Sequence, residues 1–306
     1  MSRGKPKAGF RMTKKRRALM AQNGGVMPSM SLPMNVVKLP LPVQKPVRIE
    51  TEAEIENKLR DRFATLDTMT YATVRGSNKS MIVSGPAGVG KSYSIGQILG
   101  DAGGKVYSTV IKGYVKATGL YKTLYEFRDK NSVVVFDDAD SIFADEVSLN
   151  LLKAACDTTK KRVLSWLSET KMEDEEGERV PRSFEFEGSI VFITNYDFDD
   201  MIARGSRLSP HFEAMISRSH YVDLGMKTTM DYIVRIKQVV RDHKMLRDAG
   251  YSAHEEREVI DFIVDNKDRL RELSLRMVLK LASLMRINGS NWKTLAKTTA
   301  FKSEEA

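Results

Sequence analysis

The sequence predicts an α/β fold: a parallel sheet that carries a phosphate-binding loop, followed by a small α-helical domain. Three observations support this prediction. A glycine-rich run at residues 85–92 lies between a strand-like and a helix-like segment, continuously apolar runs occur at 132–136 and 189–193, and helical periodicity dominates from Met226 onward. Continuously apolar strands are typical of parallel sheets, which are buried on both faces. We therefore expect a buried parallel sheet first and helices alone after it.

The composition is that of an ordinary globular protein. The chain has 306 residues, of which 42% are hydrophobic and 29% are charged. Cys156 is the only cysteine, so an intrachain disulfide is excluded and a reducing, cytoplasmic compartment is expected. No apolar run approaches the length that spans a bilayer, and we expect no membrane partner.

The net charge of +9 belongs to the first 48 residues. This segment holds 11 basic residues and no acidic one, whereas the remainder holds 38 basic against 40 acidic residues. Six of the nine prolines also lie here, which together with weak hydrophobic periodicity predicts a disordered tail over residues 1–48. A basic arm that binds nucleic acid, a solvated extension and a targeting peptide all fit this composition.

Order is predicted to begin near Thr51. This residue and Glu54 form a capping-box signature at the start of a helix. The helix has one apolar stripe, made of Ile55, Leu59, Phe63 and Leu66. We expect this stripe to pack beside the core.

The run at 85–92 matches the phosphate-binding pattern G-x-x-x-x-G-K-[ST], with the strand before it and the helix after it that the pattern requires. Glycines let the backbone turn so that successive N–H groups converge on phosphate oxygens. Lys91 is predicted to reach the β- and γ-phosphates, and Ser92 to bind Mg²⁺. The nucleotide-binding residues are therefore predicted to be Gly85, Pro86, Ala87, Gly88, Val89, Gly90, Lys91 and Ser92.

Strands are next predicted at 105–111 and 132–136, separated by an amphipathic helix. The second of these strands ends in an acidic turn that contains Asp137 and Asp138. Carboxylates at the carboxyl end of a parallel strand lie in the crevice where open α/β sheets bind ligands. We expect Asp137 to hold the Mg²⁺ shell and Asp138 to orient or deprotonate a water that attacks the γ-phosphate.

Taken in order, the motifs resemble those of the AAA+ ATPases. Residues 85–92 are similar to the Walker A motif of that family and residues 133–138 to its Walker B motif. Asn195, which closes the strand that begins at 189, looks like sensor 1. Arg218, just before the next strand, resembles the arginine finger offered to a neighbouring subunit. Arg276, at the start of a late helix, resembles sensor 2.

The resemblance implies an ATPase that binds ATP and Mg²⁺ and works as a homo-oligomeric ring, most often a hexamer. Beyond the disordered tail that the composition predicts at 1–48, it implies an ATPase core at 49–224 and an α-helical lid at 225–306. In one respect the chain departs from the family, which usually has Glu at the position of Asp138. Aspartate is shorter by one methylene, which favours slower turnover.

Three assignments keep alternatives. Arg204 and Arg207 also precede the last strand, and either is an alternative to Arg218 as the finger. Tyr114 follows the second strand, where the rings of the family project an aromatic residue into a central pore, but an ordinary surface tyrosine fits equally. The insert at 162–187 has two strand-like runs joined by an acidic run, which predicts a hairpin with a charged tip.

Three uses of ATP hydrolysis compete. A ring motor or remodeller that acts on a polypeptide is favoured slightly, because of Tyr114 and the hairpin. A DNA-associated ATPase, such as a loader or replication accessory, is favoured by the basic tail. A slow nucleotide-switched assembly scaffold is favoured by aspartate at position 138.

Overall fold

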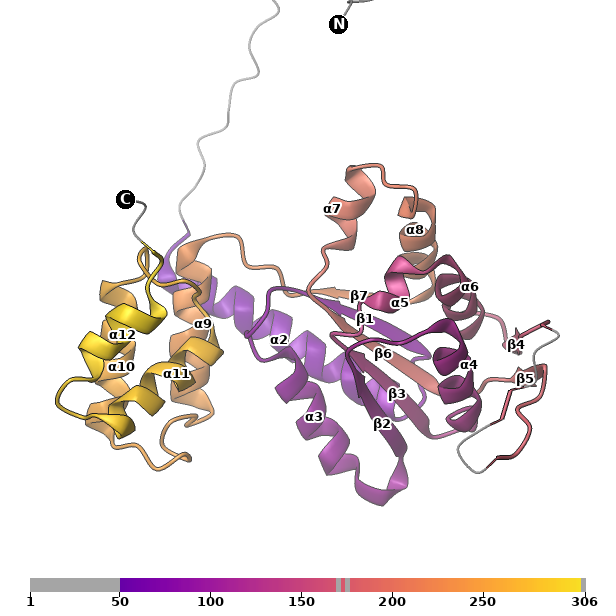
Figure 1. The fold of residues 1–306 in the computed structure, drawn as a ribbon, viewed down its shortest axis with the longest axis horizontal. Helices are drawn as coiled ribbons and strands as arrows, with labels where there is room; N and C mark the ends of the chain where they lie inside the picture. Colours follow the sequence, from indigo (N-terminus) through magenta and orange to yellow (C-terminus); the bar gives the residue numbers. More distant parts are fainter. Residues whose placement is uncertain (1–49, 169–171, 174–176, 304–306) are drawn as a thin grey trace, which may run out of the picture. The chain divides into compact units, whose positions relative to one another are not determined.

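The computed structural model of this protein describes residues 50–168, 172–173 and 177–303, so the basic tail at 1–48 lies outside it. At the centre of the fold is a five-stranded parallel sheet with the strand order β2-β3-β6-β1-β7 (Figure 1). The predicted α/β class and parallel sheet are therefore confirmed. The strands are β1 (Ser80–Ser84), β2 (Tyr107–Lys112), β3 (Ser132–Asp137), β6 (Ser189–Thr194) and β7 (His220–Asp223).

The three inner strands are buried at every position, as their continuous apolar sequences predict. Strand β2 lies at an edge and is only partly covered. Strand β6 lies between β1 and β3, so the carboxyl ends of these three strands meet at one edge of the sheet. This edge therefore gathers the residues that follow each strand.

Helices cover both faces of the sheet. On one face, alternate strand residues such as Val133 and Val135 pack with the helix that precedes the sheet. On the other face, Val134 and Phe136 pack with the helices that follow β2, β3 and β6. The first layer contains α2 (Glu52–Val74) and α3 (Lys91–Ala102), which the short 3-10 turn η1 (Gly103–Lys105) follows. The second contains α4 (Ala117–Glu126), α5 (Ser141–Ala144), α6 (Glu146–Ala155), α7 (Phe198–Ala203) and α8 (Ser209–Arg218).

Helix α2 begins as its sequence predicts. The Thr51 hydroxyl accepts from the Glu54 N–H at 3.3 Å, and the Glu54 carboxylate accepts from the Thr51 N–H at 2.9 Å, which confirms the capping box. The apolar stripe from Ile55 to Leu66 is buried against the sheet. Thus both the start and the buried face of this helix follow from local sequence.

The insert forms the predicted antiparallel pair, β4 (Val163–Ser165) with β5 (Ser183–Glu185). Arg162 anchors its base: the guanidinium is buried, lies over the Phe186 ring and donates to the carbonyls of Ala155 and Gly188 at 2.7 and 2.8 Å. Residues 169–171 and 174–176 of the connecting acidic run lie outside the described residues.

Four helices follow the sheet and gather around a hydrophobic core of their own. They are α9 (Thr229–Asp242), α10 (Ala253–Asp265), α11 (Leu275–Ile287) and α12 (Trp292–Ala300). The periodicity of the sequence assigns Met230 and Leu279 to buried stripes, and both assignments are wrong: Met230 is 41% and Leu279 is 48% exposed. Met230 lies in the first turn of α9. Leu279 lies beyond the edge of the α11 stripe that Leu281 and Met285 continue.

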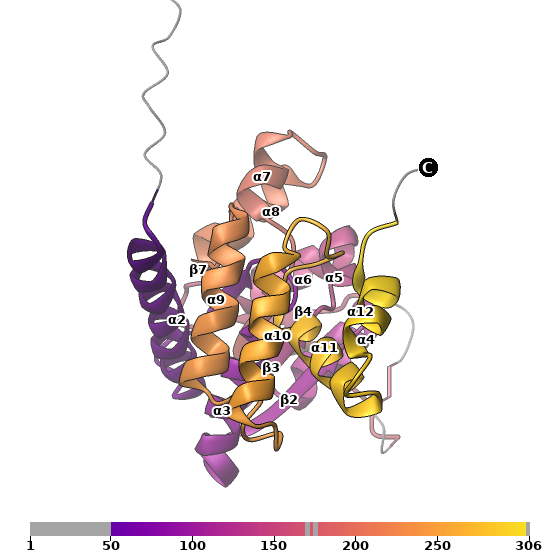
Figure 2. The ribbon, with the colours of Figure 1, turned by 90° about the vertical axis from the view of Figure 1, so that its left-hand side faces the viewer.

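Helix α2 runs beside α9 (Figures 1 and 2), and ion pairs line their contact. Glu52 pairs with Lys237 at 2.8 Å and Glu56 with Arg241 at 2.5 Å. Such exposed pairs contribute only about 0–1 kcal/mol each, so they add little to the stability of this contact.

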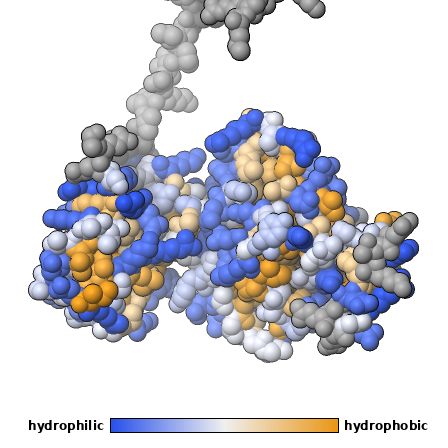
Figure 3. All heavy atoms as spheres, viewed as in Figure 1, coloured by the Kyte–Doolittle hydropathy of each residue, from blue (hydrophilic) through white to orange (hydrophobic). Residues whose placement is uncertain are grey.

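Hydrophilic residues cover most of the face in Figure 3, interrupted by hydrophobic patches where β2 and β3 lie in Figure 1. Within the described part of the chain, no helix is both long enough and apolar enough to cross a membrane.

Candidate functional site

The glycine-rich loop joins β1 to α3, as its sequence predicts. Gly88 and Gly90 have φ values of +72° and +103°, in the left-handed region that favours glycine. Space also demands glycine, since a Cβ on Gly88 would lie only 2.8 Å from the Ser274 Cβ. The loop leads directly into the amino terminus of α3, where the unpaired N–H groups and the helix dipole favour the binding of an anion.

Lys91, the first residue of α3, is buried beneath this loop. Its ammonium donates to the carbonyl of Pro86 at 3.0 Å, to the side-chain oxygen of Asn195 at 2.9 Å and to the carbonyl of Gly85. Burial lowers the pKa of Lys91 from 10.5 to about 8, although Asp138 and Asp137 favour the charged form. An anionic ligand would therefore stabilise the charged form of the Lys91 ammonium.

The predicted metal ligands lie together. The Ser92 hydroxyl donates to the buried Asp137 carboxylate at 2.8 Å, and the other oxygen of Asp137 pairs with Lys112 at 2.8 Å. Hydroxyl and carboxylate oxygens are hard ligands that suit Mg²⁺. Among the described residues no cluster of three His, Cys, Asp or Glu could hold a metal, so the remaining ligands would come from phosphates and water.

Asn195 connects the loop to the acidic turn. Its side-chain oxygen accepts from Lys91 at 2.9 Å, and its side-chain N–H donates to the Asp138 carboxylate at 2.9 Å. Asp138 itself has φ of +53°, a conformation that aspartate tolerates better than most residues. Its side chain is exposed, so the carboxylate remains open to water while Asn195 fixes one of its oxygens.

Thr194 and Asp140 tie the same turn to strand β6. The Thr194 hydroxyl donates to the Asp140 carboxylate at 2.6 Å. Burial raises the pKa of Asp140, and the Thr194 hydrogen bond opposes that rise. This contact holds β3 and β6 in register at the point where their carboxyl ends meet.

The helical group reaches the loop through the start of α11. The Leu275 N–H donates to the Gly88 carbonyl at 2.8 Å, and Ser274 caps the helix by accepting from the Met277 N–H at 3.1 Å. Arg276 follows at once and is exposed, and its charge helps to lower the pKa of Lys91. The structure therefore brings Arg276 to the same site as the loop.

Arg218 lies elsewhere. It ends α8, and the pairing of His220 with Met81 places it at the amino edge of the sheet, opposite the loop. Its guanidinium donates to the Ala214 carbonyl at 2.9 Å and lies 4.0 Å from the Asp157 carboxylate. Arg218 is partly buried, whereas the two alternative finger residues are exposed, and Arg204, the C-cap of α7, pairs with Asp200 in that helix.

Tyr114 is 76% exposed, just beyond the end of β2. The next residue, Val115, donates its N–H to the Ser141 hydroxyl at 2.9 Å, so a hydrogen bond to the start of α5 anchors the segment that presents the ring. This exposure fits both interpretations of Tyr114, the pore residue and the ordinary surface tyrosine.

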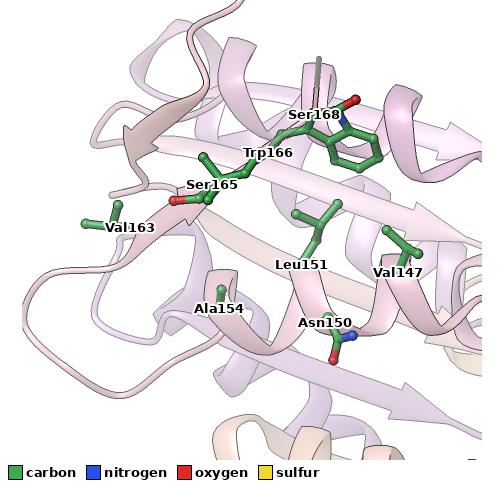
Figure 4. Close-up of a pocket in the computed structure, with 9 residues that line it drawn as sticks. Val147, Asn150, Leu151, Ala154, Val163, Ser165, Trp166 and Ser168 are labelled. Atoms are coloured by element: carbon green, nitrogen blue, oxygen red, sulfur yellow. The ribbon is translucent and has the colours of Figure 1, made fainter. Parts of the chain in front are cut away.

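A separate groove of about 490 Å³ lies between α6 and the β4 strand (Figure 4). Leu151 and Ala154 line it from the helix, and Trp166 lines it from the chain after β4. It contains no residue of the glycine-rich loop or of the acidic turn, so it lies apart from the loop site, between α6 and the insert.

Two residues that contact the glycine-rich loop or the acidic turn were not predicted from the sequence. Lys112 pairs with Asp137 because the two residues end neighbouring parallel strands and face each other in a register that the structure, and not the sequence, provides. Arg235, on α9, donates to the Val89 carbonyl at 3.2 Å. It carries no signal in the sequence, since a charged residue beside an apolar stripe is usually solvated.

Comparison with known proteins gives three kinds of match. Residues 81–214 match the sequence model of the AAA family, the ATPases associated with various cellular activities. An uncharacterized 36.7 kDa protein from the nrdC-mobD intergenic region of enterobacteria phage T4 is 37% identical over 257 residues, which cover 83% of this chain and 78% of that protein.

Remoter likenesses are found among solved structures. A mutant of Thermotoga maritima RuvB is 14% identical, with a TM-score of 0.43, over 84% of this chain and 70% of that one. NtrX from Brucella abortus in complex with ATP is 11% identical, with a TM-score of 0.46, over 86% of this chain and 56% of that one.

The family match covers the segment that contains the glycine-rich loop, the acidic turn and Asn195, and the structure brings these three features together at one edge of the sheet. The ordered motifs that resemble Walker A, Walker B and sensor 1 agree with that match. The chain therefore belongs to the AAA+ family of ATPases.

Proposed function

We propose that this protein hydrolyses ATP, bound with Mg²⁺ at the 85–92 loop, in a ring of identical subunits. The observation that carries the proposal is the hydrogen-bonded chain from Lys91 through Asn195 to Asp138. Nucleotide binding alone needs no exposed carboxylate next to the phosphate-binding lysine, whereas hydrolysis needs a group that orients water.

In this mechanism Lys91 and the loop N–H groups hold the β- and γ-phosphates, and Lys91 also stabilises the charge that develops in the transition state. Asp138 accepts a hydrogen bond from the attacking water and aims it at phosphorus, while Asn195 keeps that carboxylate in place. Ser92 and Asp137 would hold Mg²⁺, which neutralises phosphate charge when bound.

Two arginines complete the site. Arg276 lies beside the loop of its own chain and is proposed to sense the γ-phosphate from the helical lid. Arg218 lies at the opposite edge of the sheet from its own loop, which supports a role at the nucleotide of a neighbouring subunit. Both groups would then lose a partner on hydrolysis, and so bias the lid and the subunit interface together.

A polypeptide is the favoured substrate of this cycle. The supporting observation is Tyr114, an exposed aromatic side chain on a segment anchored to α5. DNA is the alternative, supported by the 11 basic residues of the 1–48 tail. A slow assembly switch remains the third candidate, because Asp138 stands where glutamate is usual.

Phosphate release by the full chain tests the proposal. We expect release that requires Mg²⁺, stops in EDTA and is abolished in Lys91→Ala. Unfolded polypeptide should raise the rate several-fold, with single-stranded and duplex DNA as comparison ligands. Stimulation by DNA alone would select the DNA-associated ATPase. Absence of release under all these conditions, with intact fold, would overturn the assignment of ATP hydrolysis.

A further inference from the structure

Two consecutive carbonyls of the phosphate loop are held by the helical group. The Gly88 carbonyl accepts from the backbone N–H of Leu275 at 2.8 Å, and the Val89 carbonyl accepts from the Nε of Arg235 at 3.2 Å. The first donor begins α11 and the second comes from the middle of α9. Two separate helices thus fix two adjacent peptide units of the loop.

Peptide geometry gives these contacts a direct consequence. In a planar trans peptide the C=O group and the following N–H group point in opposite directions. Holding the Gly88 carbonyl therefore fixes where the Val89 N–H points, and holding the Val89 carbonyl fixes the Gly90 N–H. These are N–H groups of the loop that, under the proposed function, faces the phosphates.

Arg235 is built into the fold. Only 6% of the residue is exposed, its guanidinium lies 3.2 Å from the centre of the Phe63 ring, and it donates to the Gln238 side chain at 2.9 Å. Burial lowers the pKa of Arg235 to about 10, with the charges of Asp67 and Asp242 opposing the change. The Gln238 oxygen takes one terminal N–H group of the guanidinium, and the Val89 carbonyl takes Nε.

We infer that Arg235 is a positioning residue for the nucleotide phosphates: it holds the Val89 carbonyl so that the Gly90 N–H is oriented for phosphate binding. This inference rests on the proposed function of the loop. It also gives the lid a second route to the nucleotide, because a shift of α9 or α11 changes the direction of loop N–H groups without any contribution from Arg276.

Arg235→Lys is the decisive variant. Lysine keeps the charge and the stem, but it places a methylene where arginine has Nε, so the hydrogen bond to Val89 is lost. We expect the KM for ATP and the Kd for ADP to rise about tenfold, with kcat changed less than threefold. Loop N–H groups contact the phosphates in both the ground state and the transition state, so uniform binding is what is lost.

Phe63→Leu is the matched control, because it removes the ring beneath the guanidinium but leaves the donor and its acceptor. Its ADP affinity should stay within twofold of the wild type, even if its Tm falls. Thermal melting of both variants separates stability from binding. A folded Arg235→Lys with wild-type KM and ADP affinity would overturn the inference, as would equal losses in the two variants.

The proposed function fails in a different way. If the wild type and Lys91→Ala bind ADP equally, the loop is not the phosphate site, whatever Arg235 does. If only Lys91→Ala loses affinity while Arg235→Lys binds normally, the site stands and the role of Arg235 is wrong.

Discussion

At the scale of single residues, Lys91 is the side chain on which the other charges of the site act. Its ammonium is buried, and the charges of Asp137, Asp138, Asp140 and Arg276 all act on it. The pKa of about 8 follows from burial as the largest cause. Its charge therefore becomes sensitive to mildly alkaline pH, where an ordinary lysine stays protonated.

Nucleotide affinity is accordingly expected to fall as the pH rises through about 8. Phosphates bind the protonated form and raise the Lys91 pKa, so binding takes up a proton above that pH. The Kd for ADP should then increase by up to about tenfold per pH unit until the pKa of the bound state is reached. Titration calorimetry across this range measures the slope.

Lys91→Arg is the control for the pH profile, since a guanidinium stays protonated throughout the range. Its affinity, whatever its absolute value, should show no step near pH 8. The same slope in Lys91→Arg and in the wild type would assign the titration to another group.

Most residues of the candidate site could be predicted from local sequence patterns. The loop, Asp137, Asp138 and Asn195 were predicted from local patterns, and the structure brings them together, although their roles stay predictions. The residues that hold the loop from distant parts of the chain could not be predicted in this way. Arg235 pairs with a residue 146 positions away, and only the packing of α9 on α2 and the loop creates that contact.

At the scale of elements, the site depends on how strands and helices end. Parallel pairing sets Lys112 opposite Asp137, and the order of the strands sets β6 between β1 and β3. The apolar runs predicted these strands but not their order, which depends on pairing between distant segments. The start of α11 then meets the loop at Gly88, a contact that no local pattern contains.

Gly88→Ala tests the contact between the start of α11 and the loop. The φ of +72° costs an L-residue about 1 kcal/mol, and the added Cβ would lie 2.8 Å from the Ser274 Cβ. We expect about tenfold weaker ADP binding and faster amide hydrogen exchange at the start of α11. Gly96→Ala is the control, since a Cβ there meets nothing within 4 Å and the variant should bind normally.

Adding Ser274→Gly to Gly88→Ala should restore part of the affinity. The second change removes the clashing atoms, and glycine at a helix N-cap costs only a few tenths of a kcal/mol. If the double variant binds no better than Gly88→Ala alone, the loss came from backbone strain and not from contact with α11.

At the scale of the whole molecule, two groups of elements with separate cores share one site. The sheet contributes the loop and the carboxylates, and the helices after residue 229 contribute Leu275, Arg276 and Arg235. Of these three residues the sequence predicted only Arg276, and its role stays a prediction. Arg218, which was predicted for a neighbouring subunit's site, lies at the far edge of the sheet.

Mixing two inactive variants tests the role of Arg218 across subunits. Arg218→Ala should lose activity by leaving the neighbouring site incomplete, while Lys91→Ala loses its own nucleotide. Mixed rings pair an intact loop with an intact arginine at some interfaces, so activity should reappear on mixing and be highest when the two variants are present in equal amounts. If no ratio restores phosphate release in mixed assemblies, the trans assignment is wrong.

The central claim is that Asp138, held by Asn195, directs water at bound ATP. Phosphate release by Asp138→Asn, measured beside its ATP affinity, tests this claim most directly. The amide oxygen can still accept from Asn195, so ATP binding should stay within about threefold of the wild type while turnover falls by about a hundredfold or more. Asp138→Glu, which supplies the usual residue, should turn over at least as fast as the wild type. Unchanged turnover in Asp138→Asn would contradict the account.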